Sequence, residues 1–120
     1  MVTASQVLTG VVAFLHVYFL VLEMFLWATP FGQKTFKRTA AEQESTKILA
    51  ANQGLYNGFL AAGLVWSFFG PAGYEVRVFF LACVVIAGLY GAVTASRSIL
   101  FVQALPAIAA LAVTLAARYS

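Results

Sequence analysis

One acidic side chain, Glu23, lies within an otherwise apolar stretch that runs from Val7 to Ala28. A helix crosses the hydrocarbon core of a bilayer with about 20 residues, at about 1.5 Å per residue, so this stretch is long enough to span a membrane. A carboxylate at that depth is costly unless it is paired, neutralised or hydrated, and such residues mark functional sites by default. Glu23 is therefore the first candidate for chemistry in this chain.

Further polar side chains lie at a similar depth in the other apolar stretches. Counted from one end of each predicted helix at about 1.5 Å per residue, several of them fall roughly 6–14 Å inside the membrane. Together with Glu23 they form a predicted polar layer that contains Asn52, Gln53, Asn57, Tyr90 and Gln103. Arg97 lies at the mouth of this layer, and Tyr56 shares the helical arc of the amides. His16 shares the face of Glu23, seven residues away, but lies past the membrane midplane.

Two hypotheses account for the polar layer. In the structural hypothesis, amides and a tyrosine hold Glu23 and lock the helices in register, with each interhelical polar bond contributing about 0.6–2 kcal/mol. In the functional hypothesis, Glu23 is the pH-sensitive centre of a ligand pocket, the amides and tyrosines line it, and Arg97 attracts an anionic head group. We favour the functional hypothesis, because one packing lock does not need so many polar groups. His16 fits either a hydrogen-bonded histidine of the bundle or a ligand or proton-relay residue.

Composition places these residues in a membrane protein. Hydrophobic residues make up 62% of the 120-residue chain and charged residues 9%, whereas soluble domains average about half and about a quarter. Only helices and closed barrels satisfy the backbone in lipid, and continuous apolar stretches favour helices over strands. We predict an all-α fold, a four-helix transmembrane bundle forming a single domain over residues 1–120. The predicted spans are about residues 4–29, 48–69, 76–96 and 98–118.

Basic residues predict the orientation of the bundle. One side of the membrane receives Lys34, Lys37, Arg38, Lys47 and Arg97, and the other receives Arg77 and Arg118. Because loops rich in Lys and Arg stay on the cytoplasmic side, we predict that both termini lie on the outer side. The polar layer then opens toward the cytoplasmic leaflet.

Local signals predict where the helices end. The run T-P-F-G at residues 29–32 ends the first helix, since proline and glycine continue a helix poorly. Thr39 and Glu42 have the spacing of a capping box, which predicts that the second helix begins there, outside the membrane. Pro106 lies inside the fourth span, where it removes one backbone hydrogen bond and predicts a kink.

The second predicted helix has two kinds of face. Gly54, Gly58 and Ala62 repeat every four residues, and such small residues allow a neighbouring backbone to approach closely. The amides lie on the other side of the helix. We therefore predict one face that packs and one that presents amides.

Several classes of site and partner find no support in the sequence. Cys83 is the single cysteine, so no internal disulfide can form, and one His, one Cys and one Glu at different depths do not make a metal site. No Ser-His-Asp set, catalytic carboxylate pair or phosphate-binding loop is present. The net charge of +3 comes from a few cations at span ends, which differs from a nucleic-acid footprint. We predict no metal, no cofactor and no nucleic-acid partner.

The first two helices combine recognisable motifs. His16, Glu23 and Trp27 precede Pro-Phe at 30–31, and residues 50–64 read A-A-N-Q-G-L-Y-N-G-F-L-A-A-G-L. With these motifs the chain resembles, over essentially its whole length, a widespread bacterial family of small four-helix membrane proteins of unknown function. The resemblance implies a multi-pass protein of the bacterial inner (cell) membrane, with no established activity.

Two other membrane families have a similar topology. The trimeric eicosanoid and glutathione enzymes have four helices and outward termini, but they bind glutathione through arginines and an Asn–Glu pair on the second helix. Asn52 and Asn57 are present here, without a membrane-embedded Arg or Glu on that helix. Small multidrug-resistance exporters share the length, the four helices and one Glu in the first span, but not the amide-rich second helix.

These observations lead to a functional prediction with two alternatives. We predict that the protein binds or transports a small amphiphilic molecule in the polar layer and forms a homo-oligomer in the lipid bilayer. The first alternative is a membrane-embedded enzyme acting on a lipophilic substrate. The second is a structural membrane subunit.

Overall fold

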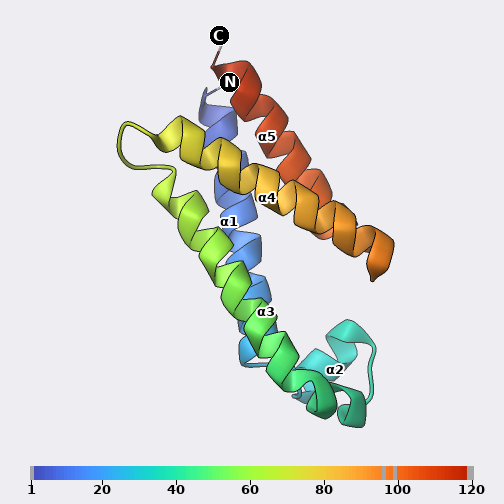
Figure 1. The fold of residues 1–120 in the computed structure, drawn as a ribbon. Coiled ribbons are helices and arrows are strands. Elements are labelled where there is room, and N and C mark those ends of the chain that lie inside the picture. The colour runs from blue at the N-terminus through green and yellow to red at the C-terminus, as the bar shows by residue number, and fades with distance from the viewer. Residues whose placement is uncertain (1, 96, 99, 119–120) are drawn as a thin grey trace. The chain divides into compact units, whose positions relative to one another are not determined.

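The computed structural model describes residues 2–95, 97–98 and 100–118, and this part of the chain is helical, with no strand. It contains five α-helices and one short π-helix, η1 (Figure 1). Their bounds are α1 Val2–Met24, α2 Pro30–Phe36, α3 Ala40–Trp66, α4 Gly73–Thr94, η1 Leu100–Ala104 and α5 Leu105–Ala117. The predicted all-α fold class is confirmed for the described residues.

Three helical segments in the described part of the chain are long and apolar enough to cross a membrane. They are Val2–Met24, Gly73–Thr94 and the continuous stretch Leu100–Ala117, and they correspond to the predicted first, third and fourth spans. The predicted second span falls in α3, whose amides and charged first turns lower its mean hydropathy. The protein therefore has the apolar helices of a membrane protein, and the fourth span stays a prediction.

The segment after α1 contains a helix that was not expected. Thr29 caps α2 by accepting a hydrogen bond on its hydroxyl from the Gly32 N–H at 3.3 Å, and Pro30 occupies the first turn. Proline suits that position because its missing N–H would have no partner there. A Cβ on Gly32 would overlap the carbonyl oxygens of Leu26 and Trp27, so only glycine fits. The T-P-F-G run thus starts α2, and the prediction that it ends the first helix is wrong, because α1 already ends at Met24.

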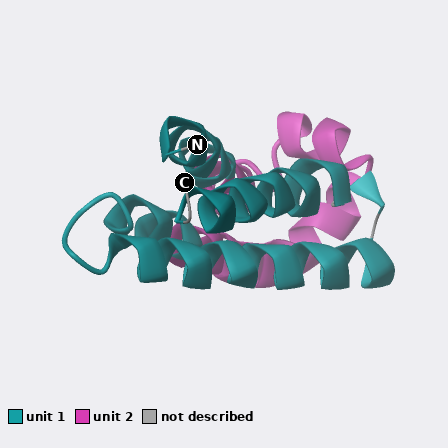
Figure 2. Ribbon diagram, turned by 90° about the horizontal axis from the view of Figure 1, so that it is seen from above, with its two compact units in different colours: residues 1–15, 60–120 teal, residues 16–59 magenta. Residues whose placement is uncertain are grey.

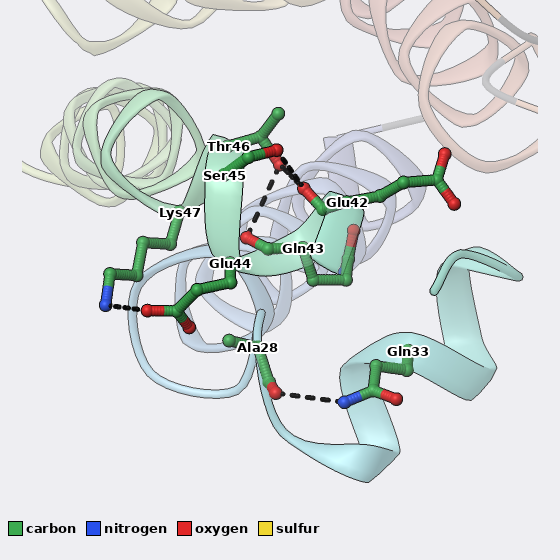
Figure 3. Close-up of polar contacts among 8 residues, drawn as sticks. All are labelled: Ala28, Gln33, Glu42, Gln43, Glu44, Ser45, Thr46 and Lys47. Carbon is green, nitrogen blue, oxygen red and sulfur yellow. Dashed lines mark hydrogen bonds and ion pairs between the residues drawn. The ribbon is translucent and has the colours of Figure 1, made fainter. Parts of the chain in front are cut away.

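The predicted capping box at the start of α3 is confirmed. The Thr39 N–H donates to Glu42 Oε1 at 3.0 Å, and the Glu42 N–H donates to Thr39 Oγ1 at 3.2 Å. The hydrogen bond from the Thr39 backbone N–H, followed by the interaction with the Thr39 side chain, holds the pKa of the Glu42 carboxyl below its ordinary value. The exposed turns that follow contain the Lys47–Glu44 ion pair (Figure 3).

The last helical segment changes its helix type just before Pro106, whereas the kink predicted there stays a prediction. The π-helix η1 covers Leu100–Ala104, and Pro106 lies in the first turn of α5. Proline lacks the N–H that an α-helix needs at an interior position, and a π-helical turn is one of the recognised ways of accommodating such a break. The irregularity therefore precedes the proline in the chain.

Contacts divide the chain into two compact units (Figure 2). Unit 1 comprises residues 1–15 and 60–120, and unit 2 comprises residues 16–59. The core of unit 1 consists of Val12, Ala13, Leu64, Leu81, Val84, Ala107 and Ala110. Where α4 meets the last helical segment, two small residues are in contact, since Gly88 lies directly against the Ala104 backbone. Such close approach provides the van der Waals contact that holds helices together in lipid.

In unit 2 the end of α1 packs on the middle of α3. A Cβ on Gly54 would lie 2.6 Å from Met24 Cγ, and one on Gly58 would lie 2.7 Å from Leu20 Cδ1. The predicted small-residue contact is confirmed at these two glycines. Ala62, the third member of the predicted face, is exposed.

The segment between α1 and α3 in unit 2 is tied down by polar and aromatic contacts. Gln43, which is fully buried, donates from Nε2 to the Trp27 carbonyl oxygen at 2.8 Å, and the Trp27 indole donates to Thr46 Oγ1 at 3.1 Å. The Trp27 and Phe36 rings lie 4.6 Å apart. Gln33 donates to the Ala28 carbonyl oxygen at 3.2 Å (Figure 3). Trp27 is thus a structural residue of this segment.

We expect Gly88→Ala to destabilise the protein. The added Cβ would lie 2.8 Å from the Ala104 nitrogen and 2.9 Å from its Cα, and overpacking of this kind typically costs about 1–3 kcal/mol. Gly10→Ala is the matched control, because no atom lies within 4 Å of a Cβ there. Thermal unfolding in detergent should show a lower Tm for Gly88→Ala and an unchanged or higher Tm for Gly10→Ala. Equal values for the two variants would contradict the close contact.

Candidate functional site

The structure brings two of the predicted site residues together in unit 2. Glu23, in the last turn of α1, is 9% exposed, and Asn57, on α3, is 8% exposed. The Asn57 side-chain amide donates a hydrogen bond to Glu23 Oε1. Gly54, one turn before Asn57, allows this approach because it has no side chain against Glu23 Cβ. The predicted pairing of Glu23 with an amide of the second helix is therefore found.

The other predicted residues of α3 do not join that contact. Asn52, Gln53 and Tyr56 are exposed. The buried stripe of α3 repeats with helical spacing through Ala50, Gly54, Asn57, Ala61 and Leu64. The predicted separation of a packing face from an amide face is thus wrong for one residue, because Asn57 lies on the packed stripe with Gly54.

The remaining predicted residues lie in different surroundings. His16 is fully buried, and its ring contacts Phe19 edge-on, with ring centroids 5.4 Å apart. Tyr90, Arg97 and Gln103 belong to unit 1, where Tyr90 and Arg97 are exposed and Gln103 is half-buried. Their part in a layer with Glu23 stays a prediction.

A second polar cluster, centred on Arg77, occupies unit 1. Arg77 lies in the second turn of α4 and is only 9% exposed. Its guanidinium donates from Nη1 to Ser5 Oγ at 3.1 Å and from Nε to Ser67 Oγ at 3.2 Å. It also donates from Nη2 to the Ser67 carbonyl oxygen at 3.4 Å and lies over the Phe68 ring. Ser5 in turn shares a 2.6 Å hydrogen bond with Thr114 of α5. Arg77 thus connects the beginning of α1, the end of α3 and, through Ser5, the end of α5.

The Arg77 cluster borders a pocket of about 250 Å³. Its polar lining consists of Ser5, Ser67, Tyr74, Arg77, Thr114 and Arg118. Arg118 lies over the Tyr74 ring, with its guanidinium carbon 4.5 Å from the ring centroid. Among the described residues, the lining contains two arginines and no Asp or Glu. Because all the other polar side chains are hydroxyls, the pocket has the chemistry of an anion-binding site.

The charge of Arg77 has hydrogen-bond partners but no counter-charge among the residues that the structure describes. No carboxylate among the described residues pairs with its guanidinium, whose contacts are two hydroxyls, one carbonyl and a ring. A buried charge that lacks an opposite charge is costly in protein and in lipid. An anion in the pocket would supply that charge.

Other kinds of chemistry find no group of residues in the described part of the chain. No set of three or more His, Cys, Asp or Glu side chains there could hold a metal ion. The hydroxyls of Ser5 and Thr114 bond to each other and have no general base beside them.

Arg77 was not among the predicted site residues, although its position within an apolar span indicated a site. An ionisable residue within an apolar span marks a functional site whatever its sign, and Arg77 lies inside the apolar helix α4. In the sequence, Arg77 contributed only to the predicted membrane orientation. Its hydroxyl partners come from distant segments, so spacing gave no hint of them.

Comparisons with known proteins place the chain in a family. A family model described as "Protein of unknown function (DUF1304)" matches residues 10–115. The chain belongs to the DUF1304 family. The uncharacterised protein YpaA of Lactococcus lactis subsp. lactis (strain IL1403) is 31% identical over 114 residues, which cover 92% of this chain and 96% of the relative. No solved structure matches. The predicted resemblance to a bacterial family of unknown function is confirmed.

The matched region of the DUF1304 protein includes Glu23, Asn57 and Arg77, whereas Ser5 and Arg118 lie outside it. The family description names no activity, ligand or partner. Function must therefore be inferred from the geometry of the two clusters.

We expect the Glu23–Asn57 contact to stabilise the DUF1304 protein. Asn57→Leu removes the donor to the Glu23 carboxyl, and a polar bond between helices in a membrane contributes about 0.6–2 kcal/mol. Glu23→Gln keeps an oxygen that can accept from Asn57 and should unfold close to the parent temperature. Asn52→Leu is the control, because Asn52 is exposed on the same helix. If thermal unfolding shows the same Tm for Asn57→Leu and Asn52→Leu, the contact contributes nothing measurable.

Proposed function

We propose that this DUF1304 protein is a multi-pass membrane protein that binds a small amphiphilic molecule through an anionic group in the Arg77 pocket. The observation that carries the proposal is the buried guanidinium of Arg77, which has no carboxylate partner within the described ranges and borders a pocket with a second arginine. The three apolar helical segments of the described chain suit a ligand whose other end is apolar. The ligand class is the one predicted from the sequence, but the proposed site is the Arg77 pocket and not the polar layer around Glu23.

Contacts within unit 1 support four membrane spans. The Ser5–Thr114 bond brings together the beginning of α1 and the end of α5, so both lie at the same membrane surface in a spanning arrangement. Such a chain must cross the membrane an even number of times. Three apolar segments are candidates, and α3 supplies a fourth crossing, because its last 18 residues reach about 27 Å at about 1.5 Å per residue.

The contacts of Arg77 agree with this path. They join the end of α3, at Ser67, to the beginning of α4 on the surface where α1 begins and α5 ends. We therefore propose a single four-helix transmembrane domain with both termini on the outer side of the bacterial cell membrane. The distribution of basic residues supports this orientation, and it places the Arg77 pocket near the outer membrane surface.

A second candidate function centres on Glu23. Its contact with Asn57 supports the polar layer near the cytoplasmic leaflet, in which Glu23 would respond to pH while a ligand binds. The exposed amides of Asn52 and Gln53 would then face the ligand or a second copy of the chain, since amides are poorly placed against lipid. Loss of pH-dependent ligand binding in a stably folded Glu23→Gln variant would support this candidate over a purely structural role.

We expect cysteine labelling to place both termini outside. On a Cys83→Ala background, Thr3→Cys near the N-terminus should react with a membrane-impermeant maleimide in intact cells, and Lys37→Cys should react only after the cells are opened. Both probe residues are exposed. Labelling of Lys37→Cys alone in intact cells would reverse the orientation. Opposite accessibility of Thr3→Cys and a matched Ala116→Cys probe would rule out an even number of spans.

We expect Arg77 and Arg118 to determine the preference for anionic ligands. Native mass spectrometry in a neutral detergent should show tighter binding of phosphatidylglycerol than of phosphatidylcholine with the same acyl chains. Arg118→Gln should reduce that preference about tenfold, because a hydrogen bond to a charged group contributes about 1.5–3 kcal/mol. Arg77→Gln should remove it.

Two controls keep this experiment interpretable. Lys34→Gln removes the same charge from an exposed residue of α2 and should leave lipid preference unchanged. Arg118 is exposed, so its variant tests the pocket even if Arg77→Gln fails to fold. Equal lipid preference in the parent, Arg118→Gln and Lys34→Gln would contradict the proposed site.

A further inference from the structure

We infer that the Arg77 pocket recognises a phosphomonoester group in preference to singly charged anions. This inference rests on the proposed function and specifies its ligand class. It follows from the number of charges in the pocket, the donors that remain free and the size of the cavity.

The charge of the lining matches a doubly charged anion. Arg77 and Arg118 provide two positive charges, and no acidic side chain in the described part of the chain lines the pocket. Glu75 lies next to Tyr74 in α4, but it is exposed and is not part of the lining. A phosphomonoester has a charge of about −1.5 to −2 at neutral pH, whereas a phosphodiester or a carboxylate has one negative charge. Only the phosphomonoester neutralises both guanidinium groups.

The donors that remain free on Arg77 suit a phosphate. A guanidinium has five N–H groups, and three of those on Arg77 bond to Ser5 and Ser67. Two are left without a partner among the described residues. These bonds also fix the plane of the guanidinium, so that its free donors are held in place for the planar, two-pronged contact that arginine makes with phosphate.

Arg118 can contribute in a different way. It is exposed, and its guanidinium lies over the Tyr74 ring at 4.5 Å. Stacking on a ring occupies the face of a guanidinium and leaves its N–H edge available. Arg77 thus provides a buried, fixed charge and Arg118 an exposed, adjustable one.

The cavity admits a head group and excludes a whole amphiphile. Its volume of about 250 Å³ is below the roughly 300–1,000 Å³ of pockets that enclose drug-sized ligands. Val2, Pro71 and Ala117 also line it and offer apolar contacts to the first atoms beyond the phosphate. Arg77 lies only four residues after Gly73, where α4 begins, so it is about 6 Å from the end of the helix. This depth suits a phosphate at the membrane surface with its tail outside the pocket.

The same chemistry predicts how affinity changes with pH. The second ionisation of a phosphomonoester has a pKa of about 6, so the ligand gains its second negative charge as the pH rises from about 5 to about 7.5. The charged groups of the lining are arginines, which stay protonated in proteins, and the remaining titratable side chain there is the phenol of Tyr74. Affinity for a phosphomonoester should therefore rise over this range, whereas affinity for a phosphodiester should stay level.

Calorimetric titration of the full chain in a neutral detergent tests the inference. The probes are dihexanoyl phosphatidic acid, a monoester, dihexanoyl phosphatidylglycerol, a diester, and inorganic phosphate. At about pH 7.5 we expect the monoester lipid to bind roughly tenfold or more tightly than the diester, and at about pH 5 we expect the difference to shrink. Arg118→Gln should lower the affinity for the monoester to the level that the parent protein shows for the diester. Lys34→Gln should change neither affinity.

The comparison probes separate the possible sources of the phosphate. Tight binding of phosphatidic acid with weak binding of inorganic phosphate identifies a lipid head group. Comparable binding of the two identifies a soluble phosphate compound and retains the preference for a doubly charged group.

Two outcomes would overturn the inference, and they differ in their meaning for the proposed function. Equal affinity for monoester and diester at both pH values, lost in Arg118→Gln, would overturn the phosphomonoester preference and leave anionic amphiphile binding intact. No preference for either anion over dihexanoyl phosphatidylcholine would overturn both. Unfolding temperatures of the variants, measured in parallel, show whether a lost affinity reflects lost folding.

Discussion

The hydrogen bonds of Arg77 hold together segments that are far apart in the sequence. Its guanidinium reaches Ser5 on α1 and Ser67 at the end of α3, and Ser5 continues to Thr114 on α5. The position of the termini, the path of the chain and the lining of the pocket all depend on these contacts. A cation is suited to this role because one guanidinium offers five donors in a fixed plane, so it can bond to several helices at once. The same charge, lacking a carboxylate partner among the described residues, makes the cluster a candidate binding site.

Small side chains account for the packing around this cluster. Gly88 lies against the Ala104 backbone, Gly63 lies beneath the Phe80 ring, and alanines form much of the buried face of α5. In lipid, helices gain little from the hydrophobic effect on contacting one another, so close backbone approach and interhelical hydrogen bonds must hold them. The two units use both devices. In unit 2, Gly54 permits the approach and Asn57 makes the bond to Glu23.

The sequence predicted those features that depend on local spacing or on composition. The helical class, the capping box at Thr39 and Glu42 and the contact made by Gly54 follow from rules that act over a few residues. The pairing of Glu23 with Asn57 was predicted from depth, because two helices that cross the same bilayer bring equal depths together. The predicted amide wall was less successful. Asn52 and Gln53 share an arc with Asn57, but only Asn57 reaches the stripe that faces α1.

The Arg77 pocket could not be assembled from the sequence, because its residues come from four separated segments. Serine and threonine are common in membrane helices, and nothing in the spacing of Ser5, Ser67 and Thr114 shows that they share one charge. Helix α2 was missed for a different reason. Thr29 and Pro30 were interpreted as a stop signal for the preceding helix, but α1 ends at Met24 and these residues cap and begin α2.

The π-helix η1 changes how the end of the chain can tolerate altered length. A π-helical turn contains an extra residue relative to an α-helical turn, so the faces before and after it are offset from a regular 100° progression. In α5 the buried residues Ala107, Ala110 and Thr114 follow their own regular stripe beyond this offset. Loss of one residue within Leu100–Ala104 would restore a plain α-helical turn and keep that stripe facing α4, whereas loss of one residue farther along α5 would turn the stripe away. A one-residue deletion within η1 would therefore leave Thr114 in the Arg77 cluster, whereas a deletion in α5 before Thr114 would rotate it away.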